Sequence, residues 1–229
     1  MPDAEYGVLF DVDGTLIDTT YLHAVCWAQA LLAKDHVVPM SDIHHAIGMG
    51  SEELLGHLLG EDRDTDEDDE LVAGHLALYH QYWGNLSRLP GARELMAACA
   101  EHGLRVVLAS SASQSELEAL QSALDAGDTV FTATSSSDAE SGKPRPDILQ
   151  AALEQSGLAA DRVVFVGDAV WDGAAASRAG VEFIGVTCGG TAEADLREAG
   201  AKEIWRNPAD LLEHLNDSAL GALAVKARR

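Results

Sequence analysis

Short apolar runs that alternate with helical patterns are the feature that most constrains the fold of this 229-residue chain. Five such runs are rich in β-forming residues: YGVLF, LRVVLAS, TVFTA, RVVFVG and VEFIGVT. Continuous apolar runs are typical of strands buried on both faces, and helices between them allow parallel pairing through right-handed crossovers. The pattern therefore predicts an α/β fold with a doubly wound, Rossmann-like parallel sheet.

One interval breaks this alternation. Residues 17–103 contain no convincing strand, and the interval is far longer than a connection between a strand and a helix needs. Helical patterns occupy residues 21–34, 51–59 and about 65–83. We therefore expect an α/β core of residues 1–18 and 87–216, with a small helical cap domain, residues 19–86, inserted after the first strand. Residues 217–229 are predicted to be a disordered tail.

The charge balance excludes some classes of partner. Fifteen Lys and Arg against 38 Asp and Glu give 15 − 38 = −23, and such a field repels nucleic acid and anionic membrane surfaces. The apolar run near the start is too short for a signal peptide or a membrane span, so a cytoplasmic protein is expected. The acidic run over residues 61–70 is interpreted as a solvated loop that enters a helix.

Two aspartates stand two residues apart at the end of the first predicted strand, in the stretch FDVDGTL. Alternate side chains of a strand share a face, so Asp11 and Asp13 would lie about 6–7 Å apart on one side. Such a pair is costly unless a cation or a shared proton relieves the repulsion. The pair therefore predicts a metal ion. A calcium loop is excluded, because Thr15 and Leu16 stand where that loop needs an Asp or Asn and a Gly.

Polar side chains also follow the other strands, and in open α/β sheets ligands bind at the carboxyl ends of the strands. The residues at these ends are Asp11, Asp13, Gly14 and Thr15, then Ser110 and Ser111, then Lys143 in SGKPRPD, and finally Asp168 and Asp172 in VGDAVWD. We expect these carboxylates, hydroxyls and the lysine to converge at one edge of the sheet.

Some of these residues also have an ordinary structural interpretation. Ser110 could be a turn residue, Asp172 could cap the following helix, and Lys143 could be a surface lysine. The chain has only four lysines, however, and the polar residues share a position at the ends of strands. We therefore favour the functional interpretation.

With these motifs the chain resembles the haloacid-dehalogenase-like (HAD) superfamily of aspartate-nucleophile phosphohydrolases, over about residues 10–190. The first motif, D-x-D-G-T followed by an apolar residue, is matched in full by residues 11–16. The serine, lysine and acidic motifs follow in the family order at Ser110, Lys143 and Asp168. The insert resembles the small helical cap of the phosphoglycolate phosphatase and β-phosphoglucomutase-like group, which closes over the site and selects the substrate.

The resemblance implies a mechanism through an aspartyl-phosphate. Asp11 would attack phosphorus as the nucleophile. Asp13 would protonate the leaving oxygen and then deprotonate the attacking water. Ser110 would hydrogen-bond a phosphoryl oxygen, and Lys143 would stabilise charge on both the nucleophile and the transferred group.

The resemblance also implies Mg²⁺ as the cofactor, because a hard, oxygen-only site suits this ion. Its ligands would be Asp11, the backbone carbonyl of Asp13 and Asp168, with Asp172 further from the ion. The residues expected to contact the substrate are Gly14, Thr15 and Ser111 in the core, and His23, Gly48 and Ser51 in the insert.

The choice among reactions depends on the insert. The dehalogenases of the superfamily lack the second aspartate of the first motif, so Asp13 favours phosphoryl transfer. In the mutases a cap arginine helps to bind a far phosphate, whereas residues 47–55, IGMGSEELL, contain no Arg or Lys. We therefore expect a phosphatase that acts on a small phosphorylated metabolite. A sugar phosphomutase of the β-phosphoglucomutase type is the alternative, and a non-catalytic metal- or phosphate-binding protein is a third hypothesis.

Overall fold

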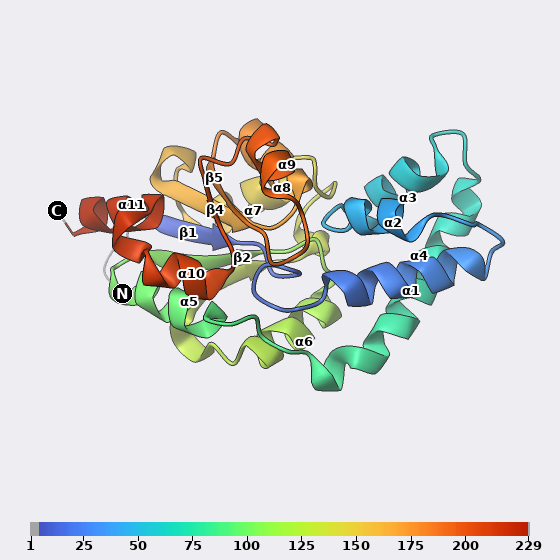
Figure 1. Ribbon diagram of the computed structural model, residues 1–229, viewed down its shortest axis with the longest axis horizontal. Helices are drawn as coiled ribbons and strands as arrows, with labels where there is room; N and C mark the ends of the chain where they lie inside the picture. The colour runs from blue at the N-terminus through green and yellow to red at the C-terminus, as the bar shows by residue number, and fades with distance from the viewer. Residues whose placement is uncertain (1–4, 229) are drawn as a thin grey trace.

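A computed structural model describes residues 5–228 of the protein. Its parallel sheet contains β1 (Gly7–Phe10), β2 (Arg105–Ala109), β3 (Val130–Thr134), β4 (Val163–Gly167), β5 (Glu182–Val186) and β6 (Glu203–Trp205). The strand order is β3-β2-β1-β4-β5-β6, and every neighbouring pair is parallel. The chain thus builds the sheet outward from β1 in both directions (Figure 1). The predicted doubly wound α/β fold is confirmed.

Helices cover both faces of this sheet because successive strand residues point to opposite sides. Val8 and Phe10 face one apolar cluster, while Leu9 faces another. The helices on the first face are α5 (Ala92–Glu101), α6 (Gln114–Leu124), α10 (Pro208–Glu213) and α11 (Ala219–Ala227). Those on the second face are α7 (Asp147–Ser156), α8 (Val170–Ala179) and α9 (Glu193–Glu198).

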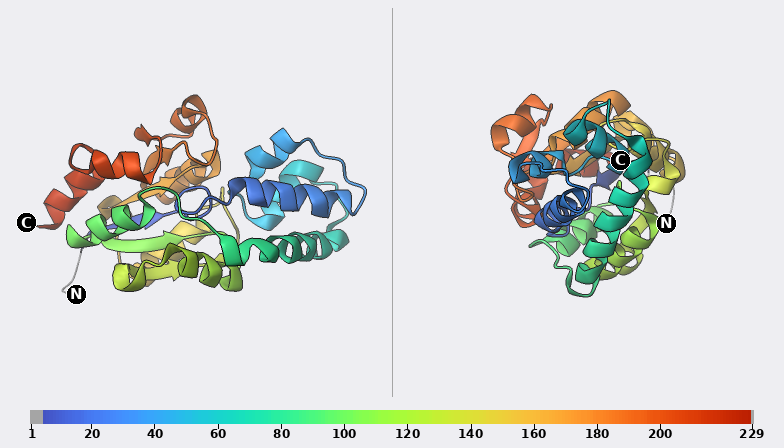
Figure 2. Two further views of the ribbon diagram at one scale, coloured as in Figure 1. Left: turned by 60° about the horizontal axis from the view of Figure 1, so that its bottom comes forward. Right: turned by 90° about the vertical axis from the view of Figure 1, so that its right-hand side faces the viewer.

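The residues between β1 and β2 form a group of helices with its own apolar cluster, to which Trp27, Leu54 and Leu71 belong. These helices are α1 (Thr20–Leu32), α2 (Met40–Ala46), α3 (Ser51–Leu59) and α4 (Asp68–Tyr79), with 3₁₀ turns at Thr65–Glu67 and His80–Asn85. Figures 1 and 2 show them gathered beyond the end of the sheet to which β1 points. We call this group, residues 19–86, the insert.

The two chain segments that join the insert to the sheet lie side by side. Ile17 and Arg88 form an antiparallel bridge. The amide of Asp18 donates to the carbonyl oxygen of Ser87 at 2.9 Å, and the amide of Leu89 donates to that of Leu16 at 2.9 Å. The chain therefore enters and leaves the insert through one hydrogen-bonded pair of segments.

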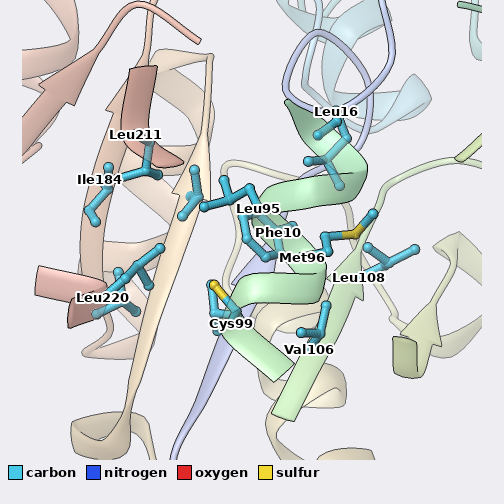
Figure 3. Packing of buried hydrophobic residues seen from close by; sticks show 14 of the residues in the cluster. Phe10, Leu16, Leu95, Met96, Cys99, Val106, Leu108, Ile184, Leu211 and Leu220 are labelled. Carbon is cyan, nitrogen blue, oxygen red and sulfur yellow. The ribbon is translucent and has the colours of Figure 1, made fainter. Parts of the chain in front are cut away.

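The prediction of a disordered tail over residues 217–229 is wrong for the part that the structure describes. Helix α11 occupies Ala219–Ala227, and the Ser218 side chain caps it by accepting from the amide of Gly221. Figure 3 shows Leu220 in the same cluster as Phe10 and Cys99. Glycine within this short segment lowers its helix propensity, and the helix forms because its apolar residues are buried against the sheet.

Strand β6 and helix α2 are among the other elements that the sequence analysis did not predict. Strand β6 has only three residues, Glu203–Trp205, and lacks the apolar run that marks the other strands. Helix α2 is seven residues long and carries two adjacent histidines. Both gain their stability from packing rather than from a local pattern.

Within residues 5–228, no helix combines the length and apolar character required to span a bilayer.

The burial of α11 leads to a test of the corrected tail. Leu220 is fully buried, so Leu220→Ala should reduce the free energy of unfolding by about 2–5 kcal/mol, because it leaves a cavity in the main core. Urea unfolding followed by circular dichroism measures this change. Val225→Ala, at a position that is 54% exposed on the same helix, is the control and should change stability by less than about 0.5 kcal/mol. Equal stability of the two variants would contradict the docked helix.

Candidate active site

The register of the central strands brings the predicted site residues to one edge. Phe10 on β1 aligns with Leu108 on β2 and with Val166 on β4. The next residue, Asp11, continues the ladder, since its amide donates to the carbonyl oxygen of Val166 at 2.9 Å. Because the strands are parallel, Ser110 and Asp168 follow at the same edge.

Lys143 is a buried cation held between two carboxylates. Its Nζ forms ion pairs with Asp11 and, at 2.8 Å, with Asp172, and only 1% of its side chain is exposed. Burial disfavours its charged form, but the two carboxylates outweigh burial and raise the pKa of Lys143. Burial raises the pKa of Asp11 to about 7, although Lys143 acts in the opposite direction. The charged lysine therefore supports the ionised form of Asp11.

The acidic side of the site contains more negative charge than Lys143 balances. Asp11, Asp168 and Asp172 can each place an oxygen within 4.8 Å of the other two. Three carboxylates and one lysine leave a net charge of 1 − 3 = −2. Burial, together with Asp11 and Asp172, raises the pKa of Asp168 well above its usual value. An all-oxygen donor set with this excess charge fits Mg²⁺.

Asp168 is oriented by its neighbours. The hydroxyl of Thr15 donates to Oδ1 of Asp168 at 2.8 Å. A Cβ atom at position 189 would lie 1.6 Å from Oδ2 of Asp168, and one at position 14 would lie 2.5 Å from it. Gly14 also has φ = +78°. Glycine at both positions therefore lets the backbone pass close to this carboxylate.

Asp13 lies in a separate hydrogen-bond network. Oδ1 of Asp13 accepts from the hydroxyl of Thr19 at 2.7 Å and lies 3.1 Å from Nε2 of His23. Burial raises the pKa of Asp13, but the bonds from His23 and Thr19 outweigh burial and hold it below the usual value. The two predicted catalytic aspartates thus have different partners, because Asp11 pairs with Lys143 and Asp13 with His23.

Two residues that the sequence analysis missed extend this network. Nδ1 of His23 lies 3.1 Å from Nε2 of His75, and Nε2 of His23 lies 3.7 Å from Oε1 of Glu116. Burial lowers the pKa of His75 to about 2 and raises that of Glu116 to about 6. The spacing of Ser113 and Glu116 is typical of a capping box, so the local sequence indicates the start of a helix and not a site residue.

A cavity of about 70 Å³ lies between the core and the insert. Asp11, Asp13, Ser111 and Lys143 line it from the core, and His23, Gly48 and Ser51 line it from the insert. The structure therefore brings these seven predicted residues around one space.

The remaining predicted residues lie outside the lining of this cavity: Gly14, Thr15, Ser110, Asp168 and Asp172. Thr15 contacts Asp168 instead. Ser110 is buried, and its Oγ accepts from the amide of Ala112 at 3.1 Å. By contrast, Oγ of Ser111 is buried and has no hydrogen-bond partner within the described residues.

The insert is closed onto the core at the N-terminal end of α3. The amide of Gly50 donates to the carbonyl oxygen of Lys143 at 3.0 Å, and the amide of Gly142 donates to Oε1 of Glu53 at 3.2 Å. A Cβ atom at position 142 would lie only 2.3 Å from Cα of Gly50. The two backbones touch here because both residues are glycine.

A second set of closing contacts lies near Asp168. Nε2 of His44 lies 3.1 Å from the carbonyl oxygen of Gly189, and Nε1 of Trp171 donates to the carbonyl oxygen of His45 at 2.7 Å. His44 and His45 therefore contact the core and do not line the cavity beside Asp13.

Comparisons with known proteins agree with this architecture. A family model described as haloacid dehalogenase-like hydrolase matches residues 7–180. The phosphoglycolate phosphatase of Rhodospirillum rubrum is 29% identical over 222 residues, which cover 92% of this chain and 90% of that protein. A hydrolase from Pseudomonas syringae has a solved structure with a TM-score of 0.89 and 31% identity, covering 93% of this chain and 99% of that chain.

A β-phosphoglucomutase from Clostridium difficile shares the fold, with a TM-score of 0.81 at 16% identity; the match covers 96% of this chain and 99% of that chain. The family match itself spans the insert and all four motif positions, so the chain is a hydrolytic enzyme that belongs to the haloacid dehalogenase-like hydrolase family.

Proposed function

We propose that the protein is a magnesium-dependent phosphatase that hydrolyses a small phosphomonoester through an aspartyl-phosphate on Asp11. One observation carries the proposal: Asp11 and Asp13 line one cavity, with Lys143 paired to Asp11 and two further carboxylates adjacent. The R. rubrum relative is named as a phosphatase, which supports the same reaction class.

The first step forms a bond between a carboxylate oxygen of Asp11 and phosphorus and breaks the bond between phosphorus and the alcohol oxygen. The proton that the leaving oxygen needs comes from Asp13, which takes up this proton once the negative charge of the bound phosphate raises the pKa of the carboxyl from its low value. Both hydrogen bonds from Thr19 and His23 go to Oδ1 of Asp13, so we assign the proton transfer to Oδ2. Lys143 remains beside Asp11 and stabilises the charge on the transferred group.

The second step is hydrolysis of the aspartyl-phosphate. Asp13, now ionised, takes a proton from water, the water oxygen bonds to phosphorus, and the bond between phosphorus and Asp11 breaks. Inorganic phosphate leaves and Asp11 is regenerated. Ser111 lines the cavity, and we assign its unpartnered hydroxyl to a hydrogen bond with a phosphoryl oxygen in both steps.

Asp11, Asp168 and the backbone carbonyl of Asp13 would hold Mg²⁺, with Asp172 further from the ion. When bound, the ion offsets the excess negative charge and shields Asp11 from the phosphate. Thr15 fixes the orientation of Asp168, and Lys143 fixes that of Asp172, so the protein supplies pre-oriented ligands.

A mutase of the β-phosphoglucomutase type is less well supported. Such an enzyme must bind a second phosphate away from the reacting one. Among the described residues that line the cavity, Lys143 is the only Lys or Arg, and it is already paired with Asp11 and Asp172. The described lining of this cavity therefore contains no unpaired Lys or Arg for a far phosphate.

The insert, residues 19–86, is proposed to act as a cap that opens to admit substrate and closes to exclude water. The closed contacts at Gly50 and Gly142 and the paired segments at Asp18 and Ser87 support this motion, since few connections favour hinge movement. A location in the cytoplasm stays a prediction.

Asp11→Asn should leave less than about a hundredth of the wild-type turnover, because an amide of the same shape is a poor nucleophile. Phosphate release from a generic aryl phosphate measures the loss, and thermal unfolding checks that the fold is intact. Asp13→Asn should instead slow transfer from esters with poor leaving groups more than transfer from the aryl ester. Normal turnover in Asp11→Asn would contradict the nucleophile assignment.

Gly189→Ala should weaken Mg²⁺ binding by roughly tenfold or more, because the added Cβ displaces Asp168. Calorimetric titration with MgCl₂ measures the affinity directly, and exhaustive chelation should abolish turnover by the wild type. Gly84→Ala is the control, since a Cβ there meets nothing within 4 Å. Unchanged Mg²⁺ affinity in Gly189→Ala would refute the role of Asp168.

When hexose phosphates are supplied, the rate of phosphate release should exceed the rate of isomer interconversion. The reason is that the described lining of the cavity contains no unpaired Lys or Arg for a second phosphate. Coupled assays for inorganic phosphate and for interconversion of hexose phosphate isomers, run on the same enzyme, make the comparison. Faster interconversion, especially with added hexose bisphosphate, would establish the mutase instead.

A further inference from the structure

Glu116 is a buried acidic residue that has no role in the proposed mechanism. It lies in the first turn of α6 and is only 4% exposed. Its Oε2 accepts from the amide of Ser113 at 3.2 Å, while Oε1 lies 3.7 Å from Nε2 of His23. Its side chain lines the cavity that also contains Asp13, where the leaving group of the substrate must lie.

The space beyond Glu116 is acidic as well. A second cavity, of about 300 Å³, shares Ser51, His75, Ser111 and Glu116 with the first, so the two meet at these residues. Its lining adds Glu52, Glu53 and Glu140 and, within the described residues, includes no Lys or Arg. A leaving group that extends from Asp13 toward this opening therefore meets carboxylates and hydroxyls.

The nearby histidines do not compensate for the missing cation. Nε2 of His23 faces Asp13 and Glu116, and Nδ1 faces His75. Both ring nitrogens of His23 are therefore already occupied. Nε2 of His75 is taken by His23, and its ring is stacked on Trp27 with the centroids 4.3 Å apart.

We infer that Glu116 is a specificity-determining residue that excludes leaving groups carrying a carboxylate or a second phosphate, so that the substrates are phosphomonoesters of small, neutral, hydroxylated alcohols. This inference rests on the proposed phosphatase function. Like charges at close range repel, and burial of Glu116 strengthens this repulsion, whereas Ser51 and Ser111 are neutral hydroxyl residues that line both cavities. Phosphoglycolate carries a carboxylate, so the inferred preference of this protein disfavours it. The R. rubrum relative, by contrast, is named a phosphoglycolate phosphatase.

Two esters of matched size test the inference. 2-Phosphoglycolate and 2-hydroxyethyl phosphate differ in that the first carries a carboxylate where the second carries a hydroxymethyl group. The wild-type enzyme should show a kcat/KM for 2-hydroxyethyl phosphate that is roughly tenfold or more above that for 2-phosphoglycolate. A higher kcat/KM for 2-phosphoglycolate would overturn the inference, whatever the variants do.

Glu116→Gln should raise kcat/KM for 2-phosphoglycolate roughly tenfold and change that for 2-hydroxyethyl phosphate by less than about threefold. Glutamine preserves the helix cap, because its amide oxygen still accepts from Ser113. Glu118→Gln is the matched control, since Glu118 is exposed on the same helix; it should leave both values unchanged. The role of Glu116 would be contradicted if Glu116→Gln and the wild type had the same ratio of kcat/KM for 2-phosphoglycolate to kcat/KM for 2-hydroxyethyl phosphate.

Binding without turnover gives an independent readout. In the Asp11→Asn background, calorimetry should show that adding Glu116→Gln tightens binding of 2-phosphoglycolate and not of 2-hydroxyethyl phosphate. Unchanged affinity for both esters would overturn the inference. Failure of the wild type to hydrolyse either ester, and a generic aryl phosphate as well, would instead overturn the proposed phosphatase function and the inference with it.

Discussion

The buried ion pairs of Lys143 are the interaction on which the site depends. A lysine that is 1% exposed must have charged partners, because an isolated buried ammonium is very costly. Its partners Asp11 and Asp172 come from the segment after β1 and from α8. The lysine itself comes from the connection between β3 and α7. The charge requirement therefore fixes three distant segments against one another at the same edge of the sheet.

The sequence predicts which edge of the sheet brings the motif residues together, because these residues directly follow the strand ends. Once the strands are parallel, Asp11, Ser110 and Asp168 must emerge together. The seven predicted residues that line the cavity include three from the insert: His23, Gly48 and Ser51. These three were expected because the insert resembles the family's helical cap, and not because of a local sequence pattern.

What the sequence did not predict depends on packing between distant segments. Glu116 and His23 are 93 residues apart, and nothing near either residue indicates that their side chains meet at 3.7 Å. Helix α11 and strand β6 have weak local patterns and are stabilised by the neighbours they pack on. The capping box with Ser113 is a sufficient local reason for a glutamate at position 116. The local sequence therefore does not indicate that Glu116 also contacts the site.

The hydrogen-bonded segments that carry the chain into and out of the insert have a consequence for how such enzymes diversify. Ile17 and Arg88 pair directly, so the chain leaves the sheet and returns to it at nearly the same point. An insert that is joined to the sheet by two adjacent segments can be lengthened, shortened or exchanged while β1 and β2 stay in register. The reacting carboxylates would then be inherited unchanged, while the surface that reads the leaving group would be free to evolve.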